Sequence, residues 1–140
     1  MKYLLSLSSL LLSLILLEIF IRFIIDDGMI YEIEMMKYAN EIKKISSNKK
    51  IGIEHKKNVK GTYMGAEVFL DKNGFRYNYS KKENNNKKIL MLGDSMTFGW
   101  GAKDTFSDLL NQKIKTHDVF NAGIGNTNTI MQINNFFYNF

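Results

Sequence analysis

The first 27 residues differ from the rest of the chain in their hydrophobic pattern. Residues 3–25 form an almost unbroken apolar run, interrupted by four serines, Glu18 and Arg22. As a helix, this run would extend roughly 34 Å, which is enough to cross the hydrocarbon core of a bilayer. Glu18 and Arg22 are four residues apart, so they share one helical face and can pair, which lowers the cost of placing them near a membrane.

We expect this segment to be an uncleaved transmembrane anchor. It is longer than the apolar region of a usual signal peptide, and residues 29–34 contain no small residue that would guide cleavage. A cleaved signal sequence and a buried helix of a soluble domain are the alternatives. Lys2 precedes the run while Asp26 and Asp27 follow it, which favours a cytoplasmic N-terminus. The expected location is the cytoplasmic membrane, crossed once, with the C-terminal domain outside the cytoplasm.

Residues 28–88 predict a juxtamembrane helix followed by an irregular leader. Apolar residues recur at helical spacing over residues 30–45, and residues 46–50 are typical of a loop. Glycines punctuate residues 51–79, which indicates short strands joined by turns. Residues 81–88, K-K-E-N-N-N-K-K, have nothing to bury and predict a polar linker.

At residue 89 the pattern changes to that of an α/β domain, which occupies residues 89–140. Residues 89–92 form a short continuous apolar run, typical of a strand buried on both sheet faces. An amphipathic helix is predicted over residues 105–114, with Asp104 or Thr105 as its cap, and a second strand ends at Asn121. A further helix is predicted after Asn126. This order of elements favours a parallel sheet with right-handed crossovers.

Two strands and two helices do not complete a parallel α/β domain, because they leave a sheet edge and apolar faces uncovered. Four of the last five residues are aromatic. We therefore expect the sequence to hold only the first part of the domain. We also expect Trp100 and the aromatic residues near the C-terminus to belong to the core.

Charge is unevenly distributed and narrows the range of partners. The net charge is +5, and residues 37–88 contain 14 basic residues against 5 acidic ones. This segment can lie against anionic lipid, although a solvated linker is the simpler interpretation. No nucleic-acid-binding motif accompanies the lysines, so no nucleic-acid partner is expected. The sequence contains no cysteine, no metal-ligand spacing and no nucleotide-binding motif, and we expect neither a metal nor a cofactor.

The candidate chemistry lies where the strand at residues 89–92 ends. Gly93, Asp94 and Ser95 follow it, and Gly99 and Gly101 allow the backbone to bend around a small group. Open α/β sheets bind ligands at the carboxyl ends of their strands, where backbone N–H groups can stabilise an oxyanion. A turn after a strand also carries Asp or Ser simply as a cap, so these residues alone do not establish catalysis.

Three segments resemble the SGNH, or GDSL, hydrolase family. Residues 89–101, I-L-M-L-G-D-S-M-T-F-G-W-G, resemble its first sequence block. Residues 119–129, V-F-N-A-G-I-G-N-T-N-T, resemble its second block. Residues 55–76 resemble a leader of membrane-anchored members that ends in Asn-x-Gly-Phe-Arg or close variants. The resemblance implies a flavodoxin-like three-layer α/β/α fold with a parallel sheet. It also implies hydrolysis of ester bonds, with O-acylated glycans or lipids as candidate substrates.

The resemblance also implies roles for individual residues. Ser95 would be the nucleophile, and its backbone N–H would contribute to the oxyanion hole. A second N–H would come from Gly125 or Asn126, and the sequence does not decide between them. The remaining residues of the first block would shape the supporting turn: Gly93, Asp94, Gly99 and Gly101.

Two further blocks of the family do not occur in the sequence. Gly-x-Asn-Asp would supply an oxyanion asparagine, and Asp-x-x-His would supply the base. The two histidines, His55 and His117, are expected on the surface, and neither is expected to pair with Ser95. Because loss of a base costs several orders of magnitude in rate, the chain as given is expected to be inactive or nearly so. It is then the N-terminal part of a hydrolase, one half of a split enzyme with a C-terminal partner chain, or a non-catalytic membrane-anchored interaction protein.

Overall fold

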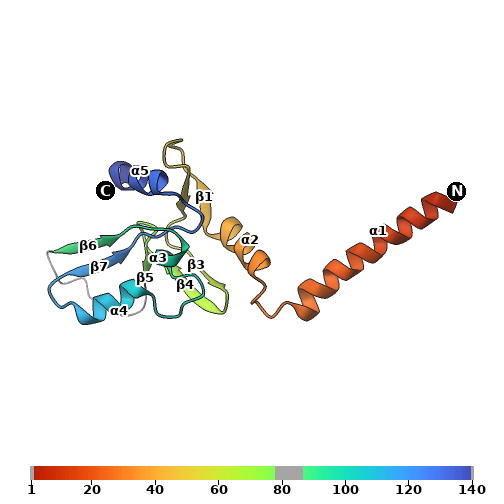
Figure 1. The fold of residues 1–140 in the computed structure, drawn as a ribbon, viewed down its shortest axis with the longest axis horizontal. Coiled ribbons are helices and arrows are strands. Elements are labelled where there is room, and N and C mark those ends of the chain that lie inside the picture. Colours follow the sequence, from red (N-terminus) through yellow and green to blue (C-terminus); the bar gives the residue numbers. More distant parts are fainter. Residues whose placement is uncertain (1, 78–86, 140) are drawn as a thin grey trace.

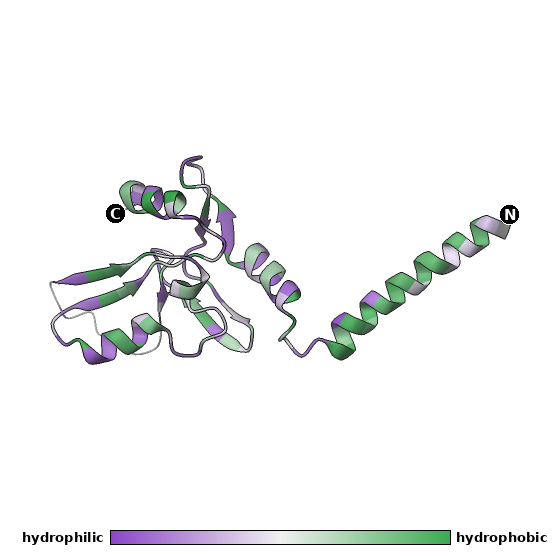
Figure 2. Cartoon of the chain, in the orientation of Figure 1, coloured by the Kyte–Doolittle hydropathy of each residue, from purple (hydrophilic) through white to green (hydrophobic). Residues whose placement is uncertain are grey.

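The structure, a computed structural model, describes residues 2–77 and 87–139. A long helix, α1 (Lys2–Phe20), continues through a π-helical turn, η1 (Ile21–Ile25), and stands apart from a small mixed domain (Figure 1). Most of α1 is hydrophobic (Figure 2). The segment Tyr3–Ile25, with a mean hydropathy of 2.4, is long and apolar enough to span a membrane. The expected pair is present, with Arg22 Nε 2.6 Å from Glu18 Oε1.

The juxtamembrane helix is shorter than predicted. It covers Tyr31–Glu41 as α2, and residues 43–45, predicted to continue it, form strand β1 (Lys43–Ile45). This strand pairs antiparallel with β2 (Ile53–His55). The predicted loop at residues 46–50 lies in the connection between the two strands. The helix prediction failed there because it relied on the helical spacing of Ile42 and Ile45. The strand is stabilised instead by pairing with residues eight or more positions later in the sequence, which local spacing does not reveal.

The main sheet is mixed. Its five strands are β3 (Lys60–Tyr63), β4 (Ala66–Leu70), β5 (Arg76–Tyr77), β6 (Lys88–Met91) and β7 (Asp118–Asn121), in the order β3-β4-β5-β7-β6. The strands β6 and β7 are parallel, as predicted, whereas β3, β4 and β5 add antiparallel strands beyond β7. The expectation of a purely parallel sheet was therefore wrong, because the strands of the leader join the same sheet.

Three helices follow β6 in the described residues, and the last two lie near their predicted positions, whereas the first occupies a segment predicted to be a turn. They are α3 (Ser95–Phe98), α4 (Phe106–Lys113) and α5 (Thr129–Asn139). Thr105 caps α4 in a capping box with Asp108, which confirms one of the two predicted caps. The strand β6 was expected to be buried on both faces, but it is an edge strand whose apolar residues are only half-buried.

The core lies where α2, the antiparallel strands and α3 meet. It contains Tyr38, Ile42, Tyr63, Val68, Leu70 and Phe98, with Trp100 packed against them as predicted. The leader is therefore part of the folded domain rather than a solvated linker; the predicted linker at residues 81–88 lies outside the described residues except for Lys87 and Lys88. The C-terminal aromatic residues do not join the core, since 39% of Phe136, 74% of Phe137 and 51% of Tyr138 is exposed.

Candidate functional site

Ser95 lies immediately beyond the carboxyl end of β6, at the start of α3. Asp94 caps this helix, because its Oδ1 accepts a hydrogen bond from the Met96 N–H at 2.9 Å. Gly99 ends the helix in the left-handed conformation, with φ of 81°, which favours glycine. Within the described residues the Ser95 hydroxyl has no hydrogen-bond partner. The serine is thus held in a short, capped turn with its side-chain oxygen uncommitted.

The loop that follows β7 runs directly beside this turn. The Ala122 N–H donates to the Met91 carbonyl and the Ile124 N–H donates to the Gly93 carbonyl, both at 2.9 Å. These bonds continue the parallel pairing of β6 and β7 beyond their last residues. The structure therefore brings together the two segments that the sequence singled out, residues 93–101 and 119–129.

Side-chain contacts fasten the second loop to α3. The Asn121 amide donates to the Thr97 carbonyl at 2.8 Å, and its Oδ1 accepts from the Gly123 N–H at 3.0 Å. Gly123 lies so close to α3 that a Cβ at this position would be 2.4 Å from the Phe98 nitrogen. Only glycine permits this approach of the two backbones.

The two candidate oxyanion donors differ in their surroundings. Gly125 is buried, and its N–H donates to the Tyr38 hydroxyl oxygen at 2.9 Å. Its carbonyl accepts from Lys43 Nζ at 3.1 Å. Asn126 is exposed, has φ of 59°, and its N–H has no partner in the described part of the chain. Of the two, Asn126 is the donor available to a ligand.

Tyr38 and His55 extend this arrangement into the core. The Tyr38 hydroxyl lies 2.8 Å from His55 Nε2, and His55 Nδ1 lies 3.1 Å from the Gly74 carbonyl. Because a carbonyl only accepts, Nδ1 carries the proton and Nε2 accepts from the tyrosine. Every donor in this series, from Lys43 through Gly125, Tyr38 and His55, therefore meets an acceptor.

The surface position expected for His55 was wrong, since only 4% of the residue is exposed. Burial lowers the pKa of His55 to about 4 and raises the pKa of Tyr38, so both groups are neutral at pH 7. The basic residues around His55 concealed this role in the sequence. No local pattern in the surrounding sequence identifies His55 as a buried residue.

Arg76 belongs to the candidate site, although the sequence analysis assigned it no role there. It is 3% exposed, and its guanidinium donates to the carbonyls of Phe98, Gly99 and Ala102 at 3.0, 2.6 and 2.6 Å. Burial lowers its pKa, and its planar fork is suited to several acceptors at once. It therefore holds the end of α3 and the following turn in place. The Asn-Gly-Phe-Arg ending of the leader, residues 73–76, was the available signal.

The structure does not bring a histidine to Ser95. His55 is committed to Tyr38 and Gly74, while His117 Nδ1 lies 2.9 Å from the Thr116 hydroxyl. Over residues 2–77 and 87–139, no group of three or more His, Cys, Asp or Glu residues could hold a metal ion. Among the described residues, the site thus offers a serine hydroxyl on one loop and the unpaired Asn126 N–H on the neighbouring loop, and no base is hydrogen-bonded to the serine.

These features define a mixed α/β protein with an N-terminal apolar helix and a serine turn braced by a second loop. A scan against models of known protein families matched none, and a search of curated proteins also found no match.

Proposed function

We propose that this chain is the serine-bearing part of a membrane-anchored ester hydrolase of the SGNH type. One observation carries the proposal: two loops lie hydrogen-bonded side by side at the carboxyl ends of parallel strands. One loop presents the uncommitted hydroxyl of Ser95, and the other presents the N–H of Asn126. This combination suits attack on a carbonyl carbon beside an oxyanion donor.

The proposed reaction has two steps. Ser95 Oγ attacks the ester carbonyl, its proton passes to a base, and the carbonyl oxygen becomes an oxyanion. The N–H groups of Ser95 and Asn126 stabilise that oxyanion, and its collapse expels the alcohol and leaves an acyl group on Ser95. Water then hydrolyses the acyl-serine and releases a carboxylic acid. Gly125 would serve by positioning Asn126, since its own N–H is bonded to Tyr38.

In this proposal β6 and β7 are the first two strands of a flavodoxin-like parallel sheet, joined through α4. The helix α1 would anchor the domain in the cytoplasmic membrane, with the serine outside the cytoplasm. The substrate would be an ester at that surface, of the O-acylated glycan or lipid class.

A second candidate is a membrane-anchored protein that binds a partner and does not catalyse. The observation that favours it is the lack of any base bonded to Ser95 among the described residues, since an unassisted serine hydroxyl is a weak nucleophile. A split hydrolase lies between the two, because a separate C-terminal chain would then supply the base.

The test is serine labelling in the membranes of cells that make the protein, where any partner is present. A biotinylated fluorophosphonate, which reacts with activated serines, is expected to modify Ser95, as located by mass spectrometry. Ser95→Ala should abolish the label, whereas Ser47→Ala, an exposed serine of the β1–β2 turn, should not. Labelling in membranes but not in the purified chain would identify a partner that supplies the base. Absence of Ser95 labelling in both would favour the non-catalytic candidate.

A further inference from the structure

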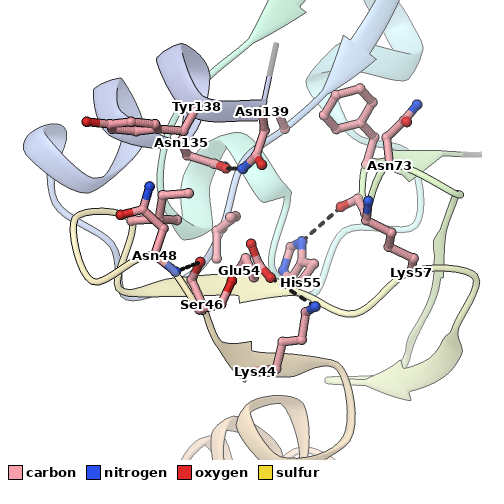
Figure 3. Close-up of a pocket in the computed structure, with 16 residues that line it drawn as sticks. Lys44, Ser46, Asn48, Glu54, His55, Lys57, Asn73, Asn135, Tyr138 and Asn139 are labelled. Atoms are coloured by element: carbon pink, nitrogen blue, oxygen red, sulfur yellow. Dashed lines mark hydrogen bonds and ion pairs between the residues drawn. The ribbon is translucent and has the colours of Figure 1, made fainter.

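A polar pocket of about 300 Å³ lies beside the framework of the candidate hydrolase site, with which it shares His55, Ala122 and Ile124. Figure 3 shows Asn135 and Asn139 of α5 along one side, Ser46, Glu54 and Lys44 of the β1–β2 hairpin along another, and Asn73 and Lys57 along a third. Ser95 is not among the lining residues. Binding in this pocket therefore does not involve the Ser95 hydroxyl itself, and it can be tested apart from the proposed reaction.

Asn135 is a buried amide that lines the pocket with an unused donor. The residue is 8% exposed, and its Oδ1 accepts from Asn139 Nδ2 at 2.5 Å. Its own amide nitrogen has no partner within the described residues. Because Asn135 lines the pocket, this nitrogen can donate a hydrogen bond to an acceptor on a bound molecule.

The opposite wall supplies further donors and an acceptor. Ser46 Oγ accepts from the Asn48 N–H at 3.2 Å, and Asn48 Oδ1 accepts from the Lys50 N–H at 3.0 Å. Their oxygens are thus occupied, while the Ser46 hydroxyl proton and the Asn48 amide protons have no acceptor in the described structure. Glu54 contributes a carboxylate that is an acceptor only.

This lining argues against several ligand classes. Binding pockets are usually mostly apolar, whereas most of the side chains that line this one are polar or charged, which disfavours an acyl chain. An anion would meet the Glu54 carboxylate, which already pairs with Lys44 at 2.9 Å, and the other lysine of the lining, Lys57, is exposed to solvent. The described residues also offer no cluster of metal ligands.

A ligand that both donates and accepts along its whole surface meets all of these conditions. Sugar hydroxyls can accept from the Asn135, Asn48 and Ser46 donors and donate to Glu54. The half-exposed ring of Tyr138 borders the pocket and offers a face on which the C–H groups of a sugar ring can pack. From this lining, we infer that the pocket between α5 and the β1–β2 hairpin binds a short neutral carbohydrate.

The experiment uses the full chain in lipid nanodiscs, since sugar-based detergents would compete. Saturation-transfer NMR measures binding of maltotriose and chitotriose, with inorganic phosphate as a charged comparison. We expect at least one trisaccharide to bind with a dissociation constant of about 1 mM, as suits a small polar ligand, and phosphate not to bind. Asn135→Leu should weaken that binding about tenfold, since one hydrogen bond is lost. Ser46→Ala, a smaller change, should weaken it several-fold.

Two matched variants make the result specific. Asn40→Leu places the same substitution on the exposed face of α2 and should leave binding unchanged. Ser95→Ala should also bind normally, which separates this inference from the proposed hydrolase. Binding of neither sugar, binding of phosphate instead, or sugar binding that is unchanged in both pocket variants would each overturn the inference.

Discussion

Tyr38 offers a sharp test of how the leader is joined to the candidate site. Replacing it by phenylalanine retains the ring, which is fully buried among Tyr63, Phe98 and Trp100. The substitution removes only the hydroxyl. That single group accepts from the Gly125 N–H and donates to His55 Nε2.

The expected cost follows from the groups left behind. Both the Gly125 N–H and His55 Nε2 are buried, and a buried polar group left without a partner costs about 1–3 kcal/mol. Losing two such bonds should lower the free energy of unfolding by about 2–4 kcal/mol in all. Typical domains are stable by about 5–15 kcal/mol, so this is a large share of the total.

Urea titration followed by tryptophan fluorescence measures this loss. Trp100 is the single tryptophan of the chain, and its ring centroid lies 5.2 Å from that of Tyr38. It therefore reports on unfolding of the core and not on α1, which contains no tryptophan. The chain is kept in nanodiscs so that the apolar helix stays solvated by lipid.

Tyr63→Phe is the matched control. Tyr63 is equally buried, but its hydroxyl donates to Glu41 Oε2 at 2.8 Å, and Glu41 is exposed to water. Water can replace the lost partner, so the expected cost is about 1 kcal/mol. Equal losses for Tyr38→Phe and Tyr63→Phe would refute the hydrogen-bonded series that links α2 to Gly125. Faster hydrogen exchange of the Gly125 amide in Tyr38→Phe alone would support it independently.

Three further outcomes follow from the same contacts. The pKa of His55 falls from 6.5 in the unfolded chain to about 4 in the folded chain, so the unfolded state binds more protons between these values. The free energy of unfolding should therefore fall by about 3 kcal/mol as the pH drops from 6.5 to 4. The His55→Gln variant should lose this pH dependence, whereas His117→Gln should keep it. Urea titrations at each pH measure both. Arg76→Lys should lower the free energy of unfolding by about 2–4 kcal/mol in the same assay, because a single ammonium cannot reach all three carbonyls that Arg76 binds. A loss below about 1 kcal/mol would contradict the proposed role of Arg76 in holding the turn after α3. Gly123→Ala should lower the free energy of unfolding by about 2–3 kcal/mol and abolish Ser95 labelling, because a Cβ at this position overlaps the backbone of α3. Unchanged labelling would show that close contact between the two loops is not needed for the reactivity of Ser95.

Local patterns in the sequence predicted the strand before Ser95 and the helix after the serine turn, but not the short helix α3 that begins at Ser95. The apolar run at residues 89–92, the cap at Thr105 and the glycines at 99 and 101 act through neighbours a few residues away, and the corresponding strand, helix and turns are present. The parallel pairing of β6 with β7 followed from the order of elements, since a crossover helix joins parallel strands. The local predictions succeeded because the interactions that decide them are short-range in sequence, whereas the β6–β7 pairing joins residues 30 positions apart and was predicted from the order of elements alone.

The predictions that failed depended on partners far along the chain. His55 contacts Tyr38 and Gly74, and Arg76 contacts carbonyls 22–26 residues later. Nothing in the composition of residues 51–79 distinguishes a buried histidine from an exposed one. Only the folded topology, in which β5 pairs with β7, brings the leader against the serine turn.

The lysines of the leader show most clearly why charge count alone misled. Lys56 Nζ donates to the Asn40 and Glu41 carbonyls at 2.9 and 2.8 Å, and so caps the end of α2. Lys43 is 7% exposed, lies over the Tyr38 ring and donates to Gly125, and burial lowers its pKa. A long aliphatic stem allows lysine to cross the core boundary while its head finds an acceptor. A basic segment is therefore compatible with a structural role, and here two of its lysines hold the helix and the loop that frame the candidate site.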